Sequence, residues 1–347
     1  MAALRNRRAR LLAVLVAGLA LAVFALGCSE DNPQSQVPGV QLVPVPGAAL
    51  ATWSPDGQLI AVPASHGVTL LSPDGELTDR IGAPSQDLLF GMPTPIQWST
   101  DGHWLRYFTG KGPEHGGGLW ATQVRRNGSG LGQTPLGTEL AFPTWSPAGW
   151  PVVFATGPFE WEPDGTRNGP APSLRIISGP NAPAAELLAT TGLPEDPVVN
   201  DGQVLFKQTL NHHTELWTVG LDGSNPHRLA SFLYVHRYEP APSGRAIALS
   251  ATPRGGSERR LFLIPADGGA VQPIGAGAVA EGPTWSPDSR WLTFSTPEGA
   301  IRRIHPDGSG AQTIISLPGE EIRGMHWSPD GKRLLYWTFP IPSESQD

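Results

Sequence analysis

The chain has 347 residues and is acidic, with 24 Lys and Arg against 31 Asp and Glu and a formal net charge of −7. Without residues 1–27, which hold four Arg and no acidic residue, 20 basic and 31 acidic residues remain and the net charge is −11. Such a chain lacks the basic face that phosphate binding needs, so no nucleic-acid partner is expected. The 42 Gly and 37 Pro occur together with 12 Trp and 11 Phe, a composition that argues against disorder and favours an all-β protein with many short strands.

Residues 1–27 are predicted to be an export signal. Four Arg precede an uninterrupted apolar run over residues 11–26, which is the layout of a signal peptide and is shorter than the ~20 residues of a membrane span. The run ends in Ala-Leu-Gly-Cys at 25–28, which resembles the lipobox of bacterial lipoproteins, where the Cys receives diacylglycerol. Cys28, the only cysteine in the sequence, is therefore the predicted lipidation site. An uncleaved anchor or an ordinary signal peptide is the alternative.

The segment that follows, residues 28–39, is rich in Ser, Pro, Gln and acidic residues and is predicted to be a flexible tether. It leads into a single domain expected over residues 40–340, and a polar tail follows at 341–347. The domain begins with an apolar strand at 40–45 that has no hairpin partner beside it in the sequence.

A five-residue phrase, Trp-Ser-Pro-Asp-Gly, recurs along the domain at intervals of 42 to 53 residues. A period of about 40–50 residues is typical of propeller blades. Pro suits the second position of a type I turn and Gly accepts the left-handed conformation that follows, so each copy predicts a tight turn between strands. The Trp is interpreted as an anchor between neighbouring sheets, with its N–H finding a local acceptor. The copies lie at 53–57, 98–102, 145–149, 285–289 and 327–331, with worn copies at 198–202 and 240–244.

Each turn is followed by an apolar strand, a second strand, a further tight turn (Asp-Gly or Asn-Gly in most repeats) and a third strand, which gives four strands per repeat. The phrase occurs seven times, but the second hairpin occurs six times. We therefore expect a β-propeller of four-stranded antiparallel blades, seven in number with six as the alternative. The spare strand at 40–45 is expected to join the last blade and close the ring, which removes exposed sheet edges.

These phrases, together with the Leu-Trp and Asp-Gly hairpins, are similar to the TolB-type β-propeller repeat, a WD40-like repeat, over roughly residues 40–338. The resemblance implies a scaffold that serves mostly as a binding platform, and fold alone does not give function. The TolB protein also carries an α/β domain before its propeller, whereas about a dozen tethering residues precede the repeats in this chain.

No nucleophile elbow, dinucleotide-binding loop or phosphate-binding loop occurs, so no catalytic residue and no cofactor are assigned. The loops of most variable length should share one face with the connections between blades, and this face is the expected binding face. Adjacent His residues on a strand point to opposite faces, so no metal is assigned to His212 and His213. The candidate partner-binding residues on the face are His66, Glu114, His115, Phe159, Glu160, Trp161, His212, His213, Glu215 and Arg254.

Two aromatic segments can be interpreted in more than one way. Phe159 and Trp161, flanked by acidic residues, suit contact with a protein or a sugar, and the alternative is that both rings fold back to plug the mouth of the ring. The aromatic segment 232–238 is expected to contribute a core strand between blades.

The leading functional hypothesis is an exported, lipid-anchored and monomeric propeller of the cell envelope, on its periplasmic or extracellular face. It would act as a non-enzymatic binding or assembly module for a protein partner. The alternatives are a sensor for a glycan or small molecule, and a propeller lyase or glycosidase with its site in the central mouth.

Overall fold

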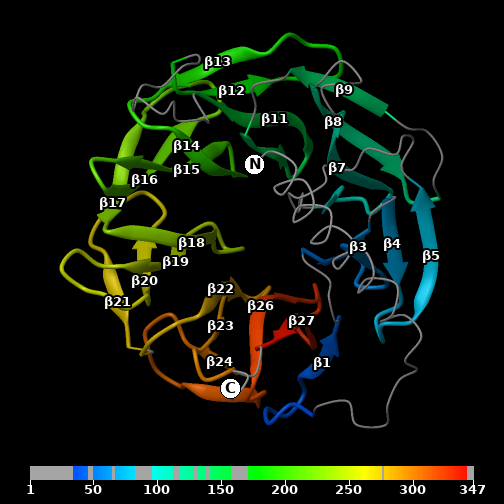
Figure 1. Ribbon diagram of the computed structural model, residues 1–347, viewed down its shortest axis with the longest axis vertical. Helices are drawn as coiled ribbons and strands as arrows, with labels where there is room; N and C mark the ends of the chain where they lie inside the picture. Colours follow the sequence, from blue (N-terminus) through cyan, green and yellow to red (C-terminus); the bar gives the residue numbers. More distant parts are fainter. Residues whose placement is uncertain are drawn as a thin grey trace, which may run out of the picture.

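The computed structural model describes residues 34–341 except for 46–49, 65–66, 83–95, 112–117, 128–131, 138–140, 158–170 and 276. Within these residues the chain forms 27 strands, which assemble into seven sheets. The sheets are arranged as blades around a central axis (Figure 1). No helix able to cross a membrane occurs in the described part of the chain. The predicted seven-bladed, all-β propeller is therefore confirmed.

Six blades each consist of four consecutive antiparallel strands, from an inner strand near the axis to an outer strand at the rim (Figure 1). Blades 1 to 3 are formed by β2 (Thr52–Trp53), β3 (Ile60–Ala64), β4 (Gly67–Leu71) and β5 (Leu77–Gly82); by β6 (Gln97–Trp98), β7 (Trp104–Lys111), β8 (Gly118–Arg125) and β9 (Gly132–Gly137); and by β10 (Ala141–Ser146), β11 (Gly149–Thr156), β12 (Ser173–Ile177) and β13 (Ala185–Ala189). Blades 4 to 6 are formed by β14 (Pro194–Asn200), β15 (Gln203–Leu210), β16 (His213–Gly220) and β17 (His227–Phe232); by β18 (Tyr234–Pro240), β19 (Ala246–Thr252), β20 (Arg260–Pro265) and β21 (Gln272–Ile274); and by β22 (Glu281–Trp285), β23 (Leu292–Ser295), β24 (Ala300–Ile304) and β25 (Gln312–Ser316).

Blade 7 closes the ring and differs from the other six. It contains β26 (Glu320–Trp327), β27 (Arg333–Pro340) and, from the other end of the chain, β1 (Gln41–Pro44). Strand β1 pairs with β27, so the prediction that an N-terminal strand closes the ring is confirmed (Figure 1). The pairing is parallel and the described blade has three strands, whereas four antiparallel strands are the general expectation. Pro44 lacks an N–H, which limits the hydrogen bonds that the outer edge of β1 can offer.

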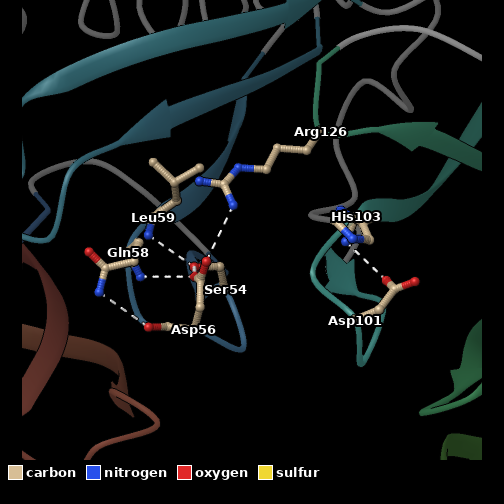
Figure 2. A network of polar contacts seen from close by, with 7 residues as sticks. All are labelled: Ser54, Asp56, Gln58, Leu59, Asp101, His103 and Arg126. Atoms are coloured by element: carbon tan, nitrogen blue, oxygen red, sulfur yellow. Dashed lines mark hydrogen bonds and ion pairs between the residues drawn. The ribbon is translucent and has the colours of Figure 1, made fainter.

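The Trp-Ser-Pro-Asp-Gly turns are stabilised by a recurring network of hydrogen bonds. In the first copy, Ser54 Oγ accepts a bond from the backbone N–H of Leu59 at 2.9 Å and donates to Asp56 Oδ1 at 2.5 Å (Figure 2). Gly57 has a positive φ of 67°, as the turn requires. The same two serine bonds recur at Ser99, Ser286 and Ser328. The sequence phrase therefore encodes a turn whose serine bonds are made within the phrase and the residues directly after it.

The indole of the phrase packs against the preceding blade. The three indole bonds are Trp53 Nε1 to His326 O at 3.3 Å, Trp285 Nε1 to Glu239 O at 3.0 Å and Trp327 Nε1 to Thr293 Oγ1 at 2.9 Å. The interpretation of the Trp as an inter-blade anchor is thus confirmed for three copies. The buried N–H groups of Trp98 and Trp145 have no acceptor among the described residues.

Candidate functional site

The propeller has two faces with different content. In each blade the chain enters the inner strand from the connection with the preceding blade, and the hairpin between the second and third strands returns to the same side. We call this side the loop face. The opposite side, which holds the Trp-Ser-Pro-Asp-Gly turns, we call the turn face.

The described residues include four of the ten candidate binding residues. His212 follows Asn211 in the two-residue turn between β15 and β16, where both have positive φ, and His213 begins β16. Among the described residues, no group of three or more His, Cys, Asp and Glu side chains could hold a metal ion. The other six candidates lie outside the described residues: His66, Glu114, His115, Phe159, Glu160 and Trp161. The predicted lipidation site Cys28 also lies outside them.

Glu215 and Arg254 both take part in contacts within the scaffold. The buried carboxylate of Glu215 accepts bonds from Gln208 at 3.3 Å, from Trp217 at 3.0 Å and from Arg228 at 2.6 Å. Burial alone would raise the pKa of Glu215, but these bonds outweigh it and the net pKa is lowered. The side chain of Arg254 donates to a hydroxyl on β17 at 2.8 Å. Glu215 thus joins neighbouring strands of blade 4, and Arg254 links blade 5 to it.

The most concentrated chemistry of the loop face lies at the first residues of the inner strands. A β-bulge interrupts the inner strand of blades 4, 5 and 6 close to its start, and bulges re-aim side chains. Charged and aromatic side chains from these strands and their neighbours form a continuous set, which we call the inner-strand cluster. Its members are Glu195, Asp196, Lys207, Tyr234, His236, Arg237, Glu239, Arg259 and Glu281.

Lys207 is the buried charge at one end of the cluster. Its side chain is 7% exposed, and its Nζ lies 2.8 Å from Asp196 Oδ2 and 3.6 Å from Glu195 Oε2. Burial acts to lower the pKa of Lys207, but the two carboxylates outweigh it and raise the pKa, so the ammonium stays charged. Burial raises the pKa of Glu195. The Nζ also lies 5.7 Å from the ring centre of Tyr234, at the distance of a cation–π contact.

His236 continues the cluster on the other side of Tyr234. The two rings are 4.6 Å apart in an edge-on arrangement, and His236 Nε2 is 3.0 Å from Thr252 Oγ1. Burial, together with the positive charges of Arg259 and Lys207, lowers the pKa of His236 to about 4. The imidazole is therefore neutral at pH 7.

Two arginines and two carboxylates complete the cluster between blades 5 and 6. Arg259 donates to Ser250 Oγ at 3.1 Å and lies 3.9 Å from Glu281 Oε2. Arg237 lies 3.7 Å from the same Glu281 and 3.9 Å from Glu239. Burial raises the pKa of Glu239, against the opposing effect of Arg237 and of a bond from the backbone N–H of the motif indole residue in blade 6. Every carboxylate of the cluster thus has a cation beside it.

Exposed apolar groups stand beside this polar set. Tyr234 is 46% exposed and Leu233 is 41% exposed, at the connection between β17 and β18. The expectation of a core strand over 232–238 holds for Val235 and Tyr238, which are buried. It misses Tyr234, which begins the strand on the loop face. The sequence did contain a sign of this, because successive side chains of a strand point to opposite sides and Tyr234 and Val235 therefore cannot both face the same core.

Comparison with known proteins gives the fold. No protein-family model matches the sequence, and no curated protein is similar to it in sequence. The chain is similar in structure to TolB from Acinetobacter baumannii, with 16% identity and a TM-score of 0.51 over 77% of this chain; it spans 63% of the TolB chain. It is also similar to an oligogalacturonate lyase from Vibrio parahaemolyticus, with 14% identity and a TM-score of 0.62 over 82% of this chain and 84% of that chain. An oligogalacturonate lyase in complex with manganese gives 13% identity and a TM-score of 0.63 over 82% of this chain and 83% of that chain. These likenesses confirm the propeller fold that the TolB-type repeats imply.

Proposed function

We propose that the protein is an exported, lipid-anchored propeller of the cell envelope that binds a protein partner on its loop face and has no enzymatic activity. Structures of the same fold include both TolB and a lyase, so the fold alone does not decide between binding and catalysis. The proposal therefore rests on the content of the loop face.

The observation that carries the proposal is the distribution of exposed apolar side chains. The described residues contain six large apolar side chains that are exposed, and four of them belong to the loop face: Leu233, Tyr234, Phe339 and Ile341. Tyr234 belongs to the inner-strand cluster and Leu233 directly precedes it, and aromatic residues next to arginines are the usual anchors of protein interfaces. The other two follow from the end of β27 in blade 7. The loop face therefore combines apolar anchors with a fixed polar surface.

The state of the cluster favours binding over catalysis. A general base needs a free carboxylate or imidazole within reach of a substrate proton. The neutral imidazole of His236 already has its Nε2 engaged by Thr252 Oγ1 at 3.0 Å. The carboxylates of Glu195, Asp196, Glu239 and Glu281 are each paired with Lys207 or with an arginine. Such a paired set holds its geometry without a ligand, which suits a docking surface that is already formed before the partner arrives.

The test is co-purification from detergent-solubilised envelope with three forms of the full chain. These are the wild type, Tyr234→Ser on the loop face, and Leu77→Ser, whose side chain is similarly exposed but belongs to the turn face. We expect one protein to be retained by the wild type and by the Leu77 variant, and at least tenfold less of it by the Tyr234 variant. Equal recovery with all three forms, or no retained protein, would reject protein binding on this face and leave the glycan or small-molecule ligand.

The location is tested separately through Cys28. Labelled palmitate should be incorporated into the wild-type chain and not into Cys28→Ser, because this is the only thiol in the sequence. The wild type should fractionate with the envelope membrane, and the variant should not. Labelling that persists in Cys28→Ser would contradict the predicted anchor without affecting the argument for the loop face.

A further inference from the structure

We propose that the turn face carries a second binding site, a hollow on blade 2 that takes a small oxyanion attached to a flat ring. The hollow has a volume of about 640 Å³. Its lining residues are Asp101, His103, Trp104, Arg125, Arg126 and Asn127. They come from the Trp-Ser-Thr-Asp-Gly turn, the start of β7 and the end of β8, so the hollow lies on the side of the ring opposite the inner-strand cluster.

Comparison of blade 2 with blade 6 explains why a hollow forms. Trp104 follows the motif turn of blade 2 just as Trp291 follows that of blade 6. In blade 6 the ring of Trp291 is covered twice, by the stacked ring of His305 at 3.7 Å and by the guanidinium of Arg303 at 4.0 Å. Less of the indole there is left for a ligand.

In blade 2 the same indole has less cover. The guanidinium of Arg125 lies 5.2 Å from the ring centre of Trp104, and no second ring or guanidinium stacks on this indole in the described part of the chain. The strand register shows that Gln123 takes the place that Arg303 has in blade 6. Gln123 pairs with Arg106, two residues after Trp104, and Arg303 pairs with the residue two positions after Trp291. The exchange of arginine for glutamine removes one covering group and leaves room beside Trp104.

The charges of the hollow leave one guanidinium available. Arg126 Nη1 lies 3.3 Å from Asp56 Oδ2 in blade 1. Figure 2 shows this ion pair as a dashed line. The carboxylate of Asp101 accepts a bond from the backbone N–H of His103, as Figure 2 shows. It also accepts a bond from the hydroxyl of Ser99, which is the main reason that the pKa of Asp101 is lowered. Arg125 has no carboxylate within ion-pair distance among the described residues. Its exposed fork of N–H groups is therefore free to bind an anion.

The ligand class follows from the two groups that face each other. A guanidinium fork matches the two oxygens of a phosphate or carboxylate, and an indole offers a flat apolar surface on which a ring can stack. The volume lies within the range of roughly 300–1,000 Å³ found for small-molecule sites. The fitting ligand is a ring that carries a phosphate or carboxylate group.

The test uses phenyl phosphate, benzoate and inorganic phosphate as probes. Their binding to the full chain is measured by titration calorimetry. We expect the tighter of the two ring compounds to bind with a Kd of about 1 mM or below, and inorganic phosphate to bind at least tenfold more weakly. Which ring compound is tighter decides between phosphate and carboxylate as the anionic group. Arg125→Gln should weaken the binding at least tenfold, and the matched change Arg303→Gln in blade 6 should alter it less than twofold.

Trp104→Leu separates the two halves of the site, since it should weaken the ring compounds and leave inorganic phosphate unchanged. Two results would overturn the proposal. One is the absence of saturable binding of either ring compound. The other is an equal loss of binding in Arg125→Gln and Arg303→Gln, which would indicate attraction to surface charge in general. The result is independent of whether the loop face binds a protein.

Discussion

Replacement of Ser328 by Ala tests whether the motif turn stabilises the propeller in the way that its hydrogen bonds imply. Ser328 is 1% exposed; its Oγ accepts a bond from the backbone N–H of Arg333 at 2.9 Å and donates to Asp330 Oδ1 at 2.6 Å. The variant leaves that N–H without a partner and removes one donor from the carboxylate. A buried unsatisfied group costs roughly 1–3 kcal/mol, and a hydrogen bond to a charged group contributes about 1.5–3 kcal/mol. Water can partly reach both the N–H of Arg333 and the carboxylate of Asp330, so the sum of the two effects is reduced. We expect a loss of about 2 kcal/mol in the free energy of unfolding.

The assay is urea unfolding at pH 7 followed by tryptophan fluorescence, with Ser146→Ala as the matched control. Ser146 occupies the same place in the motif of blade 3 and is also buried, but its hydroxyl makes no hydrogen bond in the described part of the chain. The control should lose about 0.5 kcal/mol or less. Equal losses in the two variants would refute the assignment of stability to the hydroxyl network.

The pH dependence gives a second check on the same turn. The bond from Ser328 is the main cause that holds the pKa of Asp330 below its ordinary value of 3.8. A carboxyl whose pKa is lowered by folding contributes stability above the unfolded value, and this stability is lost as the pH falls through the folded value. The difference between wild type and Ser328→Ala should therefore be constant at neutral pH and should narrow below pH 3.8.

Three further changes have expected outcomes measurable by the same unfolding assay. Trp327→Phe should cost about 1 kcal/mol more than Trp145→Phe, because only the first indole N–H has an acceptor. Gly324→Ala should lose about 1–3 kcal/mol and Gly275→Ala much less, because a Cβ at 324 would lie 2.0 Å from a neighbouring indole and one at 275 would touch nothing. Burial lowers the pKa of His326 to about 3, so this imidazole should cost about 2 kcal/mol of stability between pH 7 and 5, in addition to the loss from His236, and His326→Asn should remove that part of the fall.

The fold could be predicted because its information is local. Pro, Asp and Gly at fixed offsets encode a turn, and the Ser at the second position of the phrase makes the bonds seen at Ser54 and its counterparts. Counting turns gave the number of blades, and a strand with no partner in the sequence indicated how the ring closes. Even the worn copy at 240–244 keeps the backbone turn, with Gly244 at a φ of 69°.

The inner-strand cluster could not be predicted in this way. Its contacts join residues from different blades, as between Lys207 of blade 4 and Tyr234 of blade 5, or between Arg237 of blade 5 and Glu281 of blade 6. Bulges early in the inner strands set the direction of these side chains, and nothing in the sequence pattern marks a bulge. The candidate binding residues were placed in loops of variable length, whereas the carboxylates of the cluster lie on strands. The hollow on blade 2 depends on Gln123 standing where blade 6 has an arginine, and this becomes visible only when the strand register is known.

The seam between β1 and β27 has a consequence for how the ring is assembled. It pairs Gln41 with Arg333, so one flank is synthesised near the beginning of the chain and the other only near its end. Strand β1 has no partner until β27 has been synthesised. Pairing strands that are so far apart in the sequence is slow. A nascent or C-terminally truncated chain therefore has an open ring with two unpaired strand edges, which are prone to aggregation. The strands of the last blade thus decide whether the molecule stays monomeric or aggregates.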